Sequence, residues 1–300
     1  MHVLPGPNTG YTPVEYGNLK LTSYAANRVW FNFVGEDQVM KQQNDMSSAA
    51  KVWDQAAGSY DSHRHDDAVY ASCTRQATSA IPRGTPLILD AGCGTGIPTA
   101  QLARRSRQVV AVDYSYASLA QLKAKRMSNV LLVQADLRAL PFADSTFDAS
   151  VCANALQHLA AGKPQARVIE ELKRTTKMGG ILVASVHHYS KTKRRAGWNK
   201  EGNPGQPPFD YIFRFSRQEL ATLMPGAKIK AAGFYDVWRI PFFGGRIQNI
   251  IARLFGRMLA RLDYGHMLIA SVRNTKPSKI PIARQAADAW HSQAPAPMRK

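Results

Sequence analysis

The chain has 300 residues, of which 45% are hydrophobic, 9% aromatic and 20% charged, which excludes wholesale disorder and allows a sizeable core. It lacks an apolar run of about 18 residues, so a transmembrane helix is not expected. The net charge is +18, and its basic excess lies in residues 101–300, which hold 32 basic and 12 acidic side chains. Such a charge favours nucleic acid, anionic lipid or an acidic small molecule as partner. The alternative is a basic face that is only solvated.

The amino terminus lacks the basic segment and apolar stretch of a secretory signal. Three cysteines, Cys73, Cys93 and Cys152, are too few and too scattered for a disulfide framework or a zinc site. These features predict a cytoplasmic protein without a metal site, with peripheral membrane contact as the alternative location.

The predicted elements suggest three regions. Residues 1–45 contain prolines and glycines without sustained periodicity and are expected to form a weakly structured arm. Residues 46–275 are expected to form one domain, which opens with helices over 49–58 and 67–79. Residues 276–300, rich in Pro, Ala, Gln and basic side chains, are expected to form a tail.

Short apolar runs alternate with helical stretches through the centre of the chain. Unbroken apolar strands separated by helices are typical of an α/β fold with a doubly wound parallel sheet. The last two strands, with a helix between them, predict an antiparallel addition to this sheet. The expected strands cover 87–89, 109–112, 130–133, 147–153, 181–186, 229–237 and 266–272.

A glycine-rich turn follows the first strand and precedes a helix expected over 99–105. The turn reads Asp90-Ala91-Gly92-Cys93-Gly94-Thr95-Gly96. Its glycines allow a tight turn and the close approach of a ligand to the backbone. The G-x-G-x-G spacing differs from the G-x-G-x-x-G of dinucleotide-binding proteins, which disfavours a nicotinamide enzyme.

Two acidic residues follow the next two strands. Asp113 ends the second strand and Asp136 comes just after the third. Open α/β sheets bind ligands at the carboxyl ends of their strands, and an acid after the second strand can accept hydrogen bonds from ribose hydroxyls. Either acid alone could be a simple strand-end cap, but the pair and the glycine turn together predict a ligand site.

The segment from Leu87 to Val186 resembles the class I S-adenosylmethionine (SAM)-dependent methyltransferases of the small-molecule and RNA branch. The resemblance implies a Rossmann-like seven-stranded sheet of order 3-2-1-4-5-7-6 with strand 7 antiparallel, and methyl transfer that leaves S-adenosylhomocysteine. The motifs that carry it are the glycine turn, Val112-Asp113-Tyr114-Ser115, Ala135-Asp136-Leu137 with Leu140-Pro141-Phe142, Phe147-Asp148, Glu171-Leu172-Lys173-Arg174, Gly179-Gly180 and the upstream helix Trp53-Asp54-Gln55-Ala56-Ala57-Gly58-Ser59-Tyr60-Asp61.

The resemblance also assigns cofactor contacts. Asp90 and the backbone of 92–94 would hold the methionine part of SAM. After the second strand, Asp113 would bind the ribose hydroxyls and Tyr114 would pack beside adenine. After the third strand, Asp136 and Leu137 would bind the edge of adenine. An asparagine after the fourth strand would lie near the sulfonium, and a tyrosine of the upstream helix would close over the cofactor. The residues in these roles are Tyr60, Asp90, Ala91, Gly92, Cys93, Gly94, Asp113, Tyr114, Asp136, Leu137 and Asn154.

Three histidines are candidate general bases for the acceptor. His158 follows the fourth strand, and His187 and His188 follow the fifth, at the ligand end of the sheet. A structural role is the alternative for each. No base is needed unless the acceptor must lose a proton.

Two segments bear on the acceptor. Residues 187–215 combine Lys and Arg with aromatic side chains at alternate positions, which would suit RNA, a lid over a metabolite, or a short strand that buries its aromatic face. Residues 246–262 form an apolar stripe flanked by arginines, which would suit an anionic membrane or a sheet-covering helix. We expect a small-molecule or lipid-like acceptor, with RNA methylation as the alternative; the oligomeric state is not predicted.

Overall fold

The computed structural model describes residues 14–16, 19–21, 30–32, 48–65, 68–202, 211–233, 258 and 262–275. Most of the predicted arm (1–45) and membrane-binding segment (246–262), the strand end 234–237 and the whole of the predicted tail (276–300) lie outside these residues. Within the described part of the chain, no helix is both long and apolar enough to cross a bilayer.

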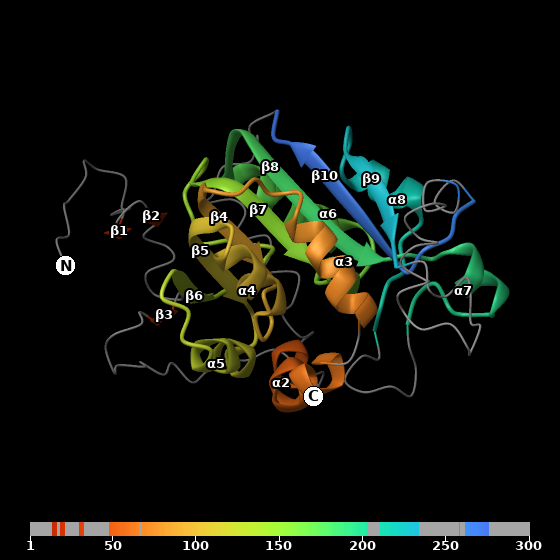
Figure 1. Cartoon of the computed structure of the whole chain (residues 1–300), viewed down its shortest axis with the longest axis horizontal. Helices are drawn as coiled ribbons and strands as arrows, with labels where there is room; N and C mark the ends of the chain where they lie inside the picture. Colours follow the sequence, from red (N-terminus) through yellow and green to blue (C-terminus); the bar gives the residue numbers. More distant parts are fainter. Residues whose placement is uncertain are drawn as a thin grey trace, which may run out of the picture.

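The central sheet has the predicted order (Figure 1). Its strands run β6-β5-β4-β7-β8-β10-β9, which is 3-2-1-4-5-7-6 in the sequence order of these seven strands. β4, β5, β6, β7 and β8 are parallel to one another, and β10 is antiparallel to both of its neighbours. The strands are β4 (Thr85–Ala91), β5 (Ser106–Asp113), β6 (Val130–Gln134), β7 (Phe147–Ala153), β8 (Thr176–His187), β9 (Lys228–Ala232) and β10 (Met267–Arg273).

The amino-terminal arm contributes an eighth strand that the sequence did not predict. β3 (Trp30–Asn32) pairs antiparallel with β6, and β1 (Val14–Tyr16) pairs with β2 (Leu19–Leu21) as a separate hairpin. β3 covers the otherwise unpaired edge of β6, where open backbone donors and acceptors favour the addition of a strand. These three short strands lie within the region that was expected to be a weakly structured arm.

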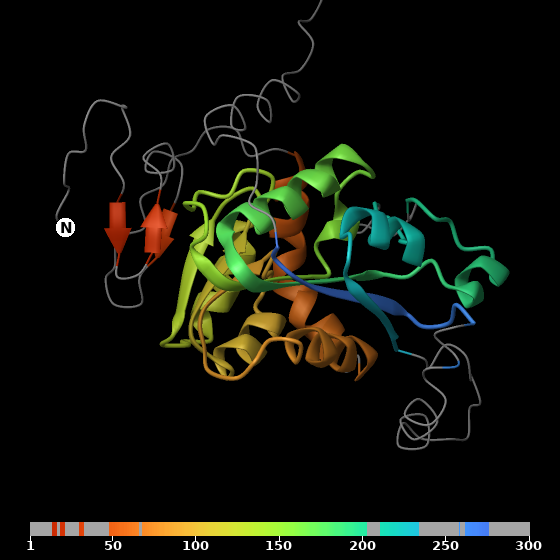
Figure 2. The same cartoon turned by 90° about the horizontal axis from the view of Figure 1, so that it is seen from above.

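Two helical layers cover the sheet (Figure 2). Side chains of α3 (Ala68–Thr78), α4 (Ile97–Ala103) and α5 (Tyr116–Ala124) pack against one face, and those of α6 (Lys163–Thr175) and α8 (Arg217–Leu223) pack against the other. Strand side chains alternate between the two cores; in β4, Leu89 joins one and Ile88 the other. Burial on both faces is why the central strands read as unbroken apolar runs.

A buried ion pair connects two motifs that lie far apart in the sequence, residues 171–174 and residues 140–142. Glu171 and Arg174 of α6 form a salt bridge of 2.8 Å with both side chains almost fully buried. Arg174 also donates to the carbonyls of Phe142 and Leu140, and Glu171 accepts from the Leu140 N–H. The pair thus binds α6 to the loop that follows Asp136, and it completes the hydrogen bonding of that buried loop.

The described parts of the segment after β8, residues 188–202 and 211–215, contain some regular structure. They include α7 (Lys191–Arg195), and Phe213 and Phe215 form single bridges with Glu201 and His188. Both phenylalanines are buried in the core. Phe213 and Phe215 therefore pack inward, as the short-strand alternative expected for the aromatic face, and these two rings are not presented for base stacking.

Candidate active site

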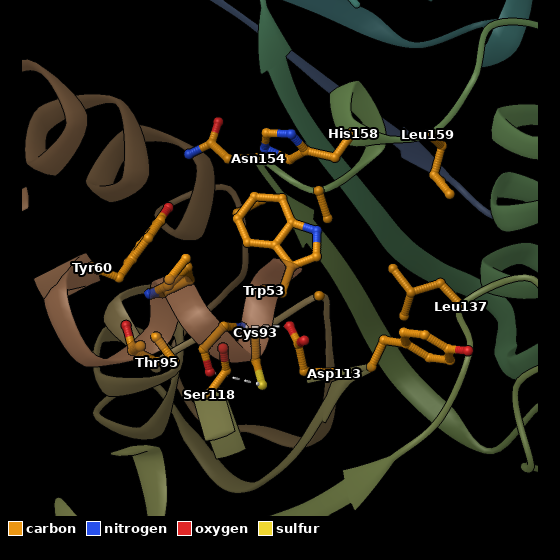
Figure 3. Close-up of a pocket in the computed structure, with 18 of the residues that line it drawn as sticks. Trp53, Tyr60, Cys93, Thr95, Asp113, Ser118, Leu137, Asn154, His158 and Leu159 are labelled. Atoms are coloured by element: carbon orange, nitrogen blue, oxygen red, sulfur yellow. Dashed lines mark hydrogen bonds between the residues drawn. The ribbon is translucent and has the colours of Figure 1, made fainter. Parts of the chain in front are cut away.

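A cavity of about 300 Å³ lies at the carboxyl ends of β4, β5, β6 and β7 (Figure 3). Its floor is the glycine turn and the strand ends, and its roof includes α2 (Ser48–His65), which extends beyond the helix predicted over 49–58. The lining includes most of the predicted cofactor residues, namely Tyr60, Gly92, Cys93, Gly94, Asp113, Tyr114, Asp136, Leu137 and Asn154. Ala91 is buried in the core behind them.

The glycine turn is bound to the end of β5. The N–H groups of Gly92 and Cys93 both donate to the Val112 carbonyl, at 2.8 and 3.0 Å. Gly92 has φ of 75°, and a Cβ at this position would overlap the Cβ of Ala155. No side chain other than hydrogen fits here, so the turn, β5 and the segment after β7 meet at one point.

The packing of the protein does not require a glycine at position 94. Gly94 has φ of 52°, and a Cβ there would meet no atom within 4 Å. Since Gly94 lines the cavity, this open space lets a ligand reach the backbone of the turn.

Asp113 is held in place by two backbone donors. Its two oxygens accept from the N–H groups of Gly94 and Ser115, at 2.7 and 2.9 Å. Burial raises the pKa of Asp113, and these hydrogen bonds oppose the shift. Each carboxylate oxygen keeps further acceptor capacity, so Asp113 can take a pair of hydroxyl donors from the cavity.

Asp90 lies beneath the cavity rather than in its wall. It is fully buried, and one oxygen accepts from Thr99 Oγ1 at 2.6 Å while Oδ1 has no partner among the described residues. Burial raises its pKa to about 7, and the nearby Asp113 adds to the shift. Asp90 does not reach the cavity, but its carboxylate charge lies close to the glycine turn and would favour a cationic ligand group bound above that turn.

Asn154 has a backbone conformation that is uncommon outside glycine. Its φ is 59°, its N–H donates to the Ser185 carbonyl at 2.9 Å, and its side chain is buried at the cavity wall. The Nδ2 group has no partner among the described residues. Strain and an unpaired donor at a cavity are typical of a ligand site.

The adenine end of the predicted site contains a residue that the sequence analysis missed. Arg138 lines the cavity and forms a bidentate contact with Asp136, with Nη2 at 2.6 Å and Nε at 3.0 Å from the carboxylate. This pair fixes the Asp136 carboxylate beside Leu137. One local pattern could have found it, because an aspartate often accepts from the backbone N–H two residues later, and Asp136 accepts from the Arg138 N–H at 2.8 Å.

The roof brings further aromatic residues to the cavity. Trp53 and Tyr60 of α2 and Tyr70 of α3 line it. Asp54 of α2 accepts from Ser115 Oγ at 2.6 Å and from the Ala117 N–H at 3.0 Å. The roof helix is therefore attached to the amino-terminal turn of α5, where a carboxylate is favoured.

Of the three candidate bases, only His158 lines the cavity. Its ring packs edge-on against Trp53, with ring centroids 4.6 Å apart, and its Nδ1 lies 3.4 Å from the Tyr211 carbonyl oxygen. Trp53 and Tyr211 thus both contact the imidazole. Figure 3 shows the Trp53 ring beside His158.

His187 and His188 lie outside the lining of this cavity. His188 is fully buried, with Nδ1 at 3.1 Å from the Gly265 carbonyl and Nε2 at 3.0 Å from Asp263. Burial lowers the pKa of His188. His187 packs its ring near His266, with centroids 5.3 Å apart. Within the described residues, no group of His, Cys, Asp or Glu side chains is arranged to hold a metal ion.

Comparison with known proteins identifies the class. A family model described as a methyltransferase domain matches residues 89–184. A probable SAM-dependent methyltransferase of Mycobacterium tuberculosis is 31% identical over 173 residues, which is 57% of each chain. A demethylmenaquinone methyltransferase of Thermobifida fusca is 34% identical over 192 residues, which cover 57% of this chain and 79% of the relative.

The fold agrees with that class. The crystal structure of a SAM-dependent methyltransferase of Thermotoga maritima, described as a possible histamine N-methyltransferase, superposes with a TM-score of 0.54 at 17% identity. The match covers 75% of this chain and 99% of that one.

The chain belongs to the class I SAM-dependent methyltransferases, and SAM is the cofactor of this family. It spans 57% of the length of the Mycobacterium tuberculosis relatives and 47% of a further curated relative. The site fits the cofactor on its own chemistry, because Asn154 at the cavity wall carries an amide with no partner among the described residues and Gly94 leaves open space beside the cavity.

We predict that Asp113→Asn weakens binding of S-adenosylhomocysteine by about tenfold to a hundredfold, because a charged acceptor for two hydroxyls becomes a neutral amide. Isothermal titration calorimetry measures this. Asp148→Asn is the matched control. Asp148 is also half-buried and accepts a hydrogen bond from the Leu87 N–H, but it lies at the amino ends of the parallel strands, opposite the cavity. Equal affinities for the two variants would remove Asp113 from the site.

Asp90 predicts a pH dependence of binding. With a pKa raised to about 7, Asp90 is mostly neutral below that pH and gains its charge above it. If the carboxylate balances the ammonium of the methionine part, affinity for S-adenosylhomocysteine rises as the pH increases through about 7. Calorimetry between pH 6 and 8 should show this rise in the wild type and a flatter profile in Asp90→Asn. A similar slope in both proteins would exclude Asp90 as its source.

Proposed function

We propose that this protein transfers the methyl group of SAM to a small-molecule or lipid-like acceptor. The observation that carries the proposal is a single cavity that joins the predicted cofactor residues to a largely apolar wall. That wall, formed by side chains such as Trp53, Leu137, Leu159 and Pro164, favours an apolar acceptor. The name of the Thermobifida fusca relative, a demethylmenaquinone methyltransferase, supports the same substrate class.

When bound, SAM supplies an activated methyl group, so the protein's main task is to position the two reactants. In this proposal Asp113 binds the ribose hydroxyls and Asp90 balances the charge of the methionine ammonium. Asp136, held by Arg138, and the Leu137 N–H read the adenine edge. Asn154 directs its amide towards the reacting end, and α2 excludes water from above.

Among the three candidate bases, His158 is the one placed to accept a proton from the acceptor, because it lines the cavity. With the Tyr211 carbonyl near Nδ1, the favoured tautomer carries its proton on Nδ1. Nε2 then carries the lone pair that a general base requires. The edge-on contact with Trp53 keeps the ring in one orientation. His187 and His188 are not used in this scheme, because they lie outside the cavity lining.

We also propose that residues 46–275 form the catalytic domain and that residues 1–45 and 276–300 are accessory to it. RNA methylation remains the alternative to a small acceptor. It is less well supported, because Phe213 and Phe215 of the 187–215 segment are buried.

The acceptor class can be tested directly with radiolabelled SAM and extract of the host cell. We expect label in the organic-soluble or small polar fraction, and none with Asp113→Asn at a SAM concentration that saturates only the wild type. Label in RNA that is removed by ribonuclease would overturn the small-acceptor proposal. Absence of transfer to any fraction, despite S-adenosylhomocysteine binding, would overturn the methyltransferase activity itself.

We predict that His158→Asn lowers kcat for the identified acceptor by about a hundredfold or more if the acceptor is a hydroxyl, because the base is lost. Affinity for S-adenosylhomocysteine should change little. His187→Asn is the control and should retain wild-type kcat. A His158→Asn enzyme whose kcat equals that of the wild type at every pH would show that His158 only packs against Trp53.

A further inference from the structure

A second surface, formed by residues outside the cavity lining, combines exposed cations with exposed apolar side chains. We name it the basic–apolar face. Its cations come from α7 and its apolar groups from the end of α7 and from the segment before β10. It consists of the exposed side chains of Arg194, Arg195, Trp198, Met258 and Leu262 and the half-buried side chains of Lys191 and Tyr264.

One of the basic side chains of α7 is buried in the fold. Lys193 is only 3% exposed, and its Nζ donates to the carbonyls of His188 and His266 at 3.0 and 3.1 Å. Because Lys193 turns inward, Arg194 and Arg195 remain exposed. α7 is therefore a short, rigidly anchored helix with its positive charge directed outward.

Asp263 attaches the distant segment to α7. Its carbonyl accepts from the Lys191 N–H at 2.9 Å, and its carboxylate contacts both Arg194 and His188. Tyr264 lies under the Lys191 ammonium, 5.8 Å from the ring centroid, and its hydroxyl accepts from Arg195. Among the described residues, Asp263 is the acid that contacts these cations, so this described part of the face keeps a net positive charge.

Apolar side chains are concentrated on the same face. In the described part of the chain, five large hydrophobic side chains are exposed, and three of them are Trp198, Met258 and Leu262, at 48%, 51% and 49%. The Leu262 N–H donates to the Met258 carbonyl at 3.0 Å, so these two side chains lie one helical turn apart and share a side. Exposed apolar groups beside cations indicate a surface that binds something.

The chemistry favours an anionic membrane over nucleic acid. Tryptophan, tyrosine and basic side chains are suited to the lipid headgroup region, and Met and Leu can enter the acyl boundary. Nucleic acid needs open aromatic faces for stacking. Here cations already lie over the rings, with Arg214 5.1 Å and Lys193 5.9 Å from the Trp198 centroid. Met258 and Leu262 offer bases no stacking surface.

We propose that the basic–apolar face docks the protein on a membrane of anionic phospholipid. α7 follows the carboxyl end of β8, the same end of the sheet at which the cavity opens beside β7 (Figure 1). Docking there would bring the substrate end of the sheet near a lipid-dissolved acceptor. The docking itself does not depend on methyl transfer, so it can fail or succeed independently of the proposed function.

The test is co-sedimentation with vesicles of phosphatidylglycerol and phosphatidylcholine, compared with vesicles of phosphatidylcholine alone. We expect salt-sensitive binding only to the anionic vesicles. The double variant Lys191→Gln with Arg195→Gln should weaken it about tenfold to thirtyfold, at roughly one basic contact's contribution each. Met258→Ser with Leu262→Ser should weaken it about tenfold through lost apolar burial.

Matched controls lie elsewhere on the surface. Arg104→Gln with Arg107→Gln removes two exposed cations at the amino end of β5, and Met178→Ser removes an exposed side chain at the start of β8. Both should bind vesicles as the wild type does, and all variants should keep wild-type affinity for S-adenosylhomocysteine, which shows that they are folded.

Three results would overturn the proposal. One is equal binding of the wild type to both kinds of vesicle, and another is an unchanged affinity of both double variants for anionic vesicles. The third is binding of polyuridylate RNA, lost in the cationic double variant, by a protein that does not sediment with vesicles; that result would assign the face to nucleic acid.

Discussion

The structure depends on the junction at which three strand ends meet around Gly92. Two N–H groups of the glycine turn share the Val112 carbonyl, and the next donor of the turn, on Gly94, reaches Asp113. At the same point the absent Cβ of Gly92 leaves room for Ala155 after β7. The arrangement of the cofactor residues follows from this contact, because it sets the turn, Asp113 and Asn154 at fixed positions relative to one another.

The sheet and the cofactor half of the site could be predicted because they rest on local rules. Buried parallel strands need apolar side chains on both faces, and a tight ligand-binding turn needs glycine. The order 3-2-1-4-5-7-6, by contrast, came from the family resemblance, since strand order involves pairings between distant segments. β3 shows the same limit: three residues of the arm complete a sheet edge that no local pattern indicates.

The acceptor half was harder to predict because it is built by tertiary contacts. His158 is oriented by Trp53 of α2 and by the carbonyl of Tyr211, which lies 53 residues further along the chain. His187 and His188 were plausible at the end of β8, but the first packs near His266 and the second is enclosed by Gly265 and Asp263. Placement at a strand end therefore did not decide whether a side chain reaches the cavity.

Charge plays different parts in the two halves of the molecule. At the cavity, the acids are few and each has a defined arrangement: Asp113 is held by backbone donors, Asp136 by Arg138, and Asp90 by Thr99 with one oxygen left unpaired. Beneath the basic–apolar face, Lys193 is buried in the fold, whereas its neighbours Arg194 and Arg195 are exposed. A cofactor site requires each charged side chain to have a defined position relative to one ligand group. A membrane surface requires only several positive charges close together and some apolar surface. The excess of basic residues after residue 100 is consistent with the second requirement and is not needed by the first.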